Sequence, residues 1–149
     1  MKIFLGADHA GFELKEIIKK ELASLGVEVF DKGATSLVET DDYPDFIAPV
    51  AKEVSADPKG SRGIIFGGSG QGEAMLANRF PNVRATVFYG GPKEIITLSR
   101  EHNNANILSL GARFLGRGEA LEIVKLWLNT NFSNDLRHIR RLEKLENSK

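Results

Sequence analysis

The sequence predicts an α/β protein: a Rossmann-like three-layer αβα sandwich with a five-stranded parallel sheet and a C-terminal helical tail. Five short apolar runs of β-type composition recur along the 149 residues, and longer segments with apolar residues at helical spacing separate them. Strands that alternate with helices in this way are joined by right-handed crossovers, so they lie parallel and are covered on both faces. Ligands of such sheets bind beyond the carboxyl ends of the strands.

The elements follow one another in a regular order. The expected strands are residues 3–5, 27–30, 63–66, 85–88 and 106–110, each bounded by glycine or polar residues. Apolar residues at helical spacing between residues 14 and 25 predict a first helix, which Gly26 ends. A second helix follows Tyr43-Pro44 and is expected to bend at Pro49, and another covers residues 120–128.

Length and composition exclude several classes of protein. The chain fits one domain, residues 1–149, of which residues 133–149 form the helical tail. Basic and acidic residues number 20 each, so no net charge favours nucleic acid or an anionic membrane surface. The lack of cysteine excludes disulfides, thiolate nucleophiles and zinc–thiolate sites. No segment resembles a signal peptide or a membrane span, and we expect a cytoplasmic protein without a membrane partner.

A glycine-rich loop, Gly67-Gly68-Ser69-Gly70-Gln71-Gly72-Glu73, directly follows the third expected strand and opens a helix. Glycines leave the backbone N–H groups unscreened, so the loop can close around an anion or a developing oxyanion. A fixed carboxylate would repel a bound phosphate. The loop therefore indicates an oxyanion hole in which Glu73 moves a proton.

Nucleotide binding is the alternative interpretation of the glycine-rich turns. The loop has Glu73 where a dinucleotide fingerprint requires its third glycine. The turn between Gly6 and Gly11 has the glycine spacing of a Walker A motif, but Phe12 stands where that motif requires lysine. Neither turn fits a nucleotide.

Two histidines lie in regions already marked by these patterns. His9 follows the first strand, and His102 lies beside Asn103 just before the fifth strand. Histidine titrates near neutral pH, which suits it to proton transfer. The sequence offers no local pair of histidines four residues apart and no compact carboxylate cluster, so we expect no metal site.

The tail carries a basic cluster around Arg137 and Arg141. These two residues are four apart and project together on a helix, a spacing suited to gripping a phosphate by bidentate hydrogen bonds. A solvated face paired with Glu143 and Glu146 explains the spacing equally well. A tail beyond the last strand reaches a neighbouring subunit's pocket more easily than its own.

Five separated motifs together resemble type B ribose-5-phosphate isomerase, in a superfamily that also contains galactose-6-phosphate isomerase subunits. The motifs are residues 6–11 (GADHAG), 42–44 (DYP), 67–73 (GGSGQGE), 100–106 (REHNNAN) and Arg137-His138-x-x-Arg141. The resemblance runs from Lys2 to about Leu145. It implies interconversion of ribose 5-phosphate and ribulose 5-phosphate through a cis-enediolate, without a cofactor.

The resemblance also implies a role for each residue of the motifs. Glu73 matches the base that carries a proton between C2 and C1, and Ser69 orients the base or the sugar oxygen. The anion hole is lined by backbone N–H groups of Gly68, Gly70, Gln71 and Gly72. His102 opens the furanose ring and Asn103 hydrogen-bonds the enediolate, while Asp8 lies near the ring hydroxyls and Tyr43 lines the pocket. His9 and Arg113 of one subunit bind the phosphate with Arg137 and Arg141 of its partner, assisted by His138.

One departure concerns the base. Another branch of the family uses a cysteine at the end of the third strand, where this sequence has Gly67, so the mechanism is assigned to carboxylate chemistry. The resemblance further implies a homodimer with shared active sites, or a tetramer of two such dimers. The alternatives are an isomerase of allose 6-phosphate or galactose 6-phosphate, a non-catalytic nucleotide- or metabolite-binding module, and a non-catalytic subunit of a hetero-oligomer.

Overall fold

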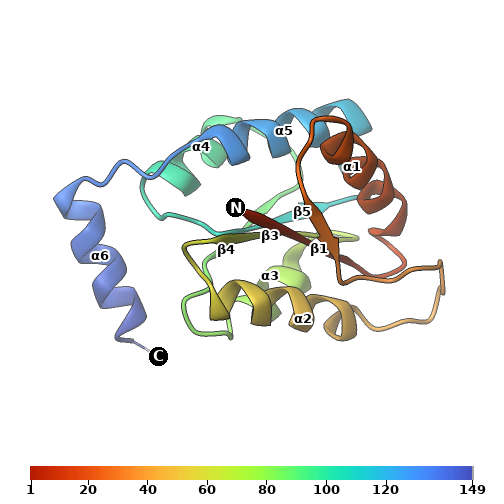
Figure 1. Ribbon diagram of the computed structural model, residues 1–149, viewed down its shortest axis with the longest axis horizontal. Helices are drawn as coiled ribbons and strands as arrows, with labels where there is room; N and C mark the ends of the chain where they lie inside the picture. The colour runs from red at the N-terminus through yellow and green to blue at the C-terminus, as the bar shows by residue number, and fades with distance from the viewer. Residues whose placement is uncertain (149) are drawn as a thin grey trace.

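A single parallel sheet forms the centre of the molecule (Figure 1). The computed structural model describes residues 1–148, and its strands are β1 (Lys2–Ala7), β2 (Val29–Asp31), β3 (Ser61–Gly67), β4 (Ala85–Phe88) and β5 (Ile107–Gly111). They lie in the order β2-β1-β3-β5-β4, and every neighbouring pair is parallel. The chain runs outward from β1 to β2 and then returns to the other side of β1 with β3. The predicted five-stranded parallel sheet is confirmed, and β1 and β3 flank its switch point.

Helices cover both faces of the sheet. They are α1 (Phe12–Ser24), α2 (Tyr43–Ala56), α3 (Gln71–Ala77), α4 (Glu94–Glu101), α5 (Arg117–Asn129) and α6 (Leu136–Glu146). Figure 1 shows α1, α4 and α5 on one face, α2 and α3 on the other, and α6 standing apart from both layers. Gly26, at φ +74°, follows the end of α1 as expected, and α2 continues through Pro49. The helix α4 was not predicted from the sequence.

Each face of the sheet has its own apolar core. On one face Ile18, Ile123 and Trp127 pack against strand residues such as Leu5 and Ile64, and all of these are fully buried. On the other face the inward side of α2 packs against the alternate residues of the same strands. The central strand β3 is buried along its whole length because helices cover both of its faces. Among the described residues no helix combines the length and the apolar character that crossing a bilayer requires.

The helix α6 is attached to the rest of the chain at its two ends. Near its start, His138 is 3% exposed and stacks on His102 with ring centroids 4.2 Å apart. Near its end, Glu146 accepts a 2.7 Å hydrogen bond from Arg84, which precedes β4. Leu136 remains 81% exposed, so part of the apolar surface of α6 has no cover in this chain. The packing of residues 133–149 on a partner subunit stays a prediction, and Lys149 lies outside the described residues.

A buried lysine fixes the segment that leads into the site. Lys15 of α1 is fully buried, and its Nζ donates to Asp31 Oδ2 at 2.6 Å and to the carbonyl of Ala34 at 2.8 Å. Lys19 donates to the same Asp31 oxygen at 2.6 Å from a partly exposed position. The two lysines therefore offer a matched comparison of a buried and a surface ion pair.

We expect Lys15→Met to lower the free energy of unfolding by about 3 kcal/mol, because it removes the buried donor and leaves the Ala34 carbonyl unpaired. Lys19→Met should lower it by about 1 kcal/mol or less, as surface ion pairs generally contribute. Urea denaturation of both variants measures the difference. Equal losses would contradict the structural role of Lys15.

Candidate active site

The loops that follow β1, β3 and β5 meet at the carboxyl edge of the sheet. Ala7 pairs with Phe66 and Gly67 pairs with Gly111, so the ends of these three strands lie side by side. This register brings together Asp8, the glycine-rich loop and Arg113. The clustering predicted for these turns is confirmed, and it lies at the switch point between β1 and β3.

Glu73 is buried in the first turn of α3. The residue is 5% exposed, and its carboxyl group lies against Gly67 so closely that a β-carbon there would overlap it. Burial raises the pKa of Glu73; a hydrogen bond from its own backbone N–H opposes this shift, and the charge of Asp8 adds to it. A carboxylate whose pKa moves toward neutral is a stronger base at physiological pH than an ordinary one.

The glycine-rich loop is held in place by its neighbours. The Ser109 hydroxyl donates to the Gly70 carbonyl at 2.6 Å, and the Arg113 N–H donates to the Gly68 carbonyl at 3.1 Å. Gly70 has φ +77°, a left-handed conformation that favours glycine. The Ser69 hydroxyl accepts a hydrogen bond from the Gln71 N–H at 3.3 Å. The loop is thus fixed before any ligand arrives, as an oxyanion hole requires.

Two further side chains approach the loop where glycines make room. A β-carbon at Gly68 would lie 3.3 Å from Cζ of Arg113, and one at Gly72 would lie 3.0 Å from Cζ of Tyr43. Asp8 is buried beside them and accepts hydrogen bonds from the N–H groups of Ala10 and Gly11 at 3.0 and 3.2 Å. Carboxylates, a phenol and a guanidinium therefore surround one backbone loop.

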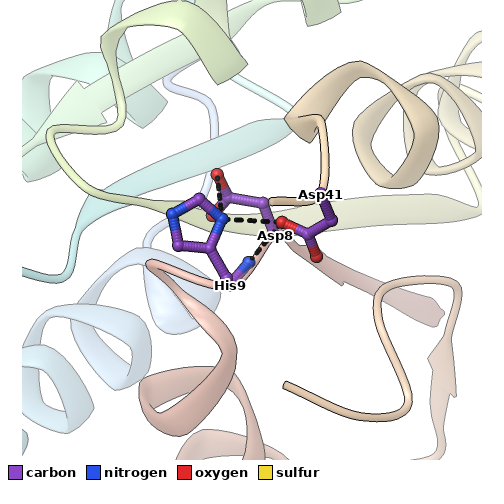
Figure 2. A group of neighbouring side chains, drawn as sticks. All are labelled: Asp8, His9 and Asp41. Carbon is purple, nitrogen blue, oxygen red and sulfur yellow. Dashed lines mark hydrogen bonds and ion pairs between the residues drawn. The ribbon is translucent and has the colours of Figure 1, made fainter. Parts of the chain in front are cut away.

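His9 has a partner that the sequence did not reveal. Figure 2 shows Asp41 beside the His9 ring: its Oδ1 lies 2.7 Å from Nδ1 and 3.0 Å from the His9 backbone nitrogen. The hydrogen bond to Asp41 raises the pKa of His9. The two residues are 32 positions apart, and the adjacent Asp42 is equally acidic. No local signal distinguishes Asp41 from it.

Asp8, His9 and Asp41 also form a compact group that the sequence did not lead us to expect. One possible ligand atom of each lies within 4.8 Å of the others. Two of these atoms, Nδ1 of His9 and Oδ1 of Asp41, already share a hydrogen bond. The geometry describes a hydrogen-bonded cluster, and the expectation that the chain has no metal site stays a prediction.

The remaining predicted residues lie at the opposite edge of the sheet. His102 ends α4 just before β5, and Asn103 lines a pocket of about 360 Å³ together with Arg84 at the start of β4. Four residue steps of β5 separate Ile107 from Gly111, which at about 3.3 Å per residue is roughly 13 Å. One chain therefore does not bring His102 or Asn103 to its own Glu73.

The tail residues belong to this second group. His138 faces its own chain and stacks on His102, while Arg137 and Arg141 are exposed on α6. Burial lowers the pKa of His138, and the charges of His102 and Arg137 lower it further. The His138 ring therefore packs on His102 within this chain, whereas both arginines lie exposed on α6, and Arg137 Nε is 3.2 Å from Asp135 Oδ2.

Comparisons with known proteins agree with both the fold and the motifs. Residues 3–145 match the family model described as Ribose/Galactose Isomerase. Ribose-5-phosphate isomerase B of Mycobacterium tuberculosis is 43% identical over 143 residues, covering 96% of this chain and 86% of that protein.

Solved structures agree closely as well. The enzyme from Mycoplasma genitalium with bound ribulose-5-phosphate has a TM-score of 0.93 at 36% identity, covering 99% of this chain and 95% of that one. The Clostridium thermocellum enzyme has a TM-score of 0.92 at 41% identity, covering 99% and 97%. Because the match spans almost the whole chain in sequence and in structure, this chain belongs to the ribose/galactose isomerase family.

Proposed function

We propose that this protein is an isomerase that interconverts ribose 5-phosphate and ribulose 5-phosphate without a cofactor. The observation that carries the proposal is the buried carboxylate of Glu73 inside a fixed loop of backbone donors. A relative in the same family holds ribulose-5-phosphate, which favours this substrate over a six-carbon sugar phosphate and over a nucleotide or metabolite that is only bound. The cytoplasmic location stays a prediction.

In the proposed mechanism, the Glu73 carboxylate takes the proton from C2 of the open-chain aldose. The electron pair of the broken C–H bond forms the C1–C2 double bond, and the carbonyl oxygen becomes an enediolate oxygen. The N–H groups of Gly68, Gly70, Gln71 and Gly72 stabilise this charge, with Ser69 orienting the reacting groups. A proton then passes from the C2 hydroxyl to the C1 oxygen, so that the charge moves to the C2 oxygen. This oxygen forms the ketose carbonyl while the electron pair of the double bond takes the proton back from Glu73 at C1. A positioned base contributes about 10²–10⁴-fold and each oxyanion donor about 10²–10³-fold.

A second copy of the chain completes the proposed site. Glu73 and His102 lie at opposite edges of one sheet. A His102 that opens the sugar ring next to Glu73 must therefore come from a second copy of the chain. In this arrangement the partner's His102 and the partner's Asn103 reach the sugar. The uncovered apolar side of α6, including Leu136, supports packing of the tail on that partner. A homodimer satisfies the geometry, and pairing of dimers into a tetramer stays a prediction.

The phosphate end is assembled in the same way. His9 and Arg113 stand on one chain beside the glycine-rich loop, and the exposed pair Arg137 and Arg141 comes from the other chain. Arginines four residues apart on a helix grip a phosphate bidentately. The fixed charge of Glu73 is then kept away from the phosphate, because the two ends of the sugar occupy different parts of the site.

Glu73→Gln should lower kcat for ribulose 5-phosphate formation by about 10²–10⁴-fold with little change in KM, because the amide fills the same space but cannot take a proton. Glu21→Gln, an exposed change on α1, is the matched control and should leave kcat unchanged. An active Glu73→Gln variant would exclude Glu73 as the base. Absence of isomerisation by the unmodified protein would exclude the proposed function.

Hybrid dimers test the shared site. Glu73→Gln and His102→Asn each inactivate both sites of a homodimer, whereas a mixed dimer keeps one site with both residues intact. After subunit exchange in an equal mixture, about a quarter of the unmodified activity should return, since half of the dimers are mixed and each has one intact site of two. If mass spectrometry detects mixed dimers but no activity returns, each chain uses its own His102.

A further inference from the structure

A hydrogen bond joins Asp41 to His9, one of the residues proposed to bind the phosphate group (Figure 2). The Asp41 side chain is 9% exposed, and its Oδ1 accepts from both the backbone N–H and the ring of His9, at 3.0 and 2.7 Å. A carboxylate can only accept hydrogen bonds. The proton of this bond therefore resides on Nδ1. The backbone hydrogen bond holds the Asp41 carboxylate in place, and the bond to Nδ1 orients the ring.

The other ring nitrogen of His9 is left available. Among the described residues Nε2 makes no hydrogen bond, and the His9 side chain is 29% exposed. Three charged groups face the ring: Asp8 at 3.9 Å in the same turn, Asp41 from the segment before α2, and Arg113 from the loop after β5. Two carboxylates against one guanidinium favour a positively charged imidazole.

We propose that Asp41 is a positioning residue for the phosphate group of the substrate: it holds the His9 ring so that Nε2–H points at the phosphate. The inference rests on the proposed function and adds a residue that the family motifs did not mark. It also accounts for the mostly buried carboxylate of Asp41, because a buried charge is stable only beside a compensating partner, here the His9 ring.

The consequence is a dependence on pH. A sugar phosphate is mostly a dianion above about pH 6, and hydrogen bonds between charged partners are the strong ones. The Asp41 hydrogen bond raises the pKa of His9, so the imidazole stays charged at pH values where an ordinary histidine has lost its proton. Without the Asp41 charge the pKa of His9 falls. The imidazole then loses its positive charge at a lower pH than in the unmodified protein, so the difference between the two proteins is largest at alkaline pH.

Asp41→Asn is the test, because it keeps the size of the side chain and removes the charge. At pH 8 the KM of Asp41→Asn for ribose 5-phosphate should be about tenfold higher than that of the unmodified protein, while kcat stays within about twofold. Near pH 6 the KM values of the variant and the unmodified protein should be equal. Asp45→Asn, an exposed change in the first turn of α2, is the matched control and should change neither value. An unchanged KM, or an increase that is equal at both pH values, would overturn the proposal.

A double-mutant cycle shows whether Asp41 acts through His9. In a His9→Asn background, Asp41→Asn should have no further effect on KM. The same increase in both backgrounds would mean that Asp41 acts on the loop as a whole and would overturn the proposal.

Nuclear magnetic resonance titration of His9, with inorganic phosphate as the probe, gives a readout that does not depend on turnover. The His9 pKa should be lower in Asp41→Asn than in the unmodified protein. Inorganic phosphate should also bind more weakly to the variant at pH 8. This measurement holds even if ribose 5-phosphate proves to be the wrong substrate, so it separates failure of this inference from failure of the proposed function. Saturable Mn²⁺ binding that Asp41→Asn abolishes would overturn the inference, because a cation displaces the Nδ1–H to Oδ1 bond.

Discussion

The carboxyl group of Glu73 occupies the space in which a side chain at position 67 would lie. Other positions of the loop show the same effect: where a residue has no side chain, the side chain of another residue can lie directly against the backbone. Gly68 lies against Arg113, Gly72 lies against Tyr43, and Gly70 turns the chain in a left-handed conformation into α3. The glycines do more than expose backbone donors to an anion. Each one makes room for a different side chain or turn.

The same contact bears on which base this chain can use. The resemblance implies that another branch has a cysteine at the end of the third strand, where this chain has Gly67. Any side chain at that position would overlap the carboxyl group of Glu73. The position that the Glu73 carboxyl group takes here therefore depends on glycine at the strand end, because a larger residue would displace it. Burial in that space also raises the pKa of Glu73, which an exposed glutamate would not experience.

Much of the fold and one half of the site follow from local sequence patterns. Alternating elements predict the parallel sheet, and parallel strands necessarily bring the loops after β1, β3 and β5 to one edge. Long-range features could not be predicted in this way. The bond between Asp41 and His9 depends on how the segment after β2 folds back, a path fixed partly by the buried Lys15. The separation of His102 from Glu73 was not predicted either, although it follows from their positions: His102 precedes β5 and Glu73 follows β3, so parallel strands place them at opposite edges of the sheet.

The central claim is that catalysis depends on the Glu73 carboxyl group seated against a bare Gly67, and Gly67→Ala tests it most directly. The added methyl group should displace the carboxyl group and lower kcat by at least about 10²-fold, with the chain still folded by circular dichroism. Gly116→Ala is the control, since a β-carbon there would contact nothing within 4 Å, and it should leave kcat unchanged. A Gly67→Ala protein that keeps full activity would contradict the account.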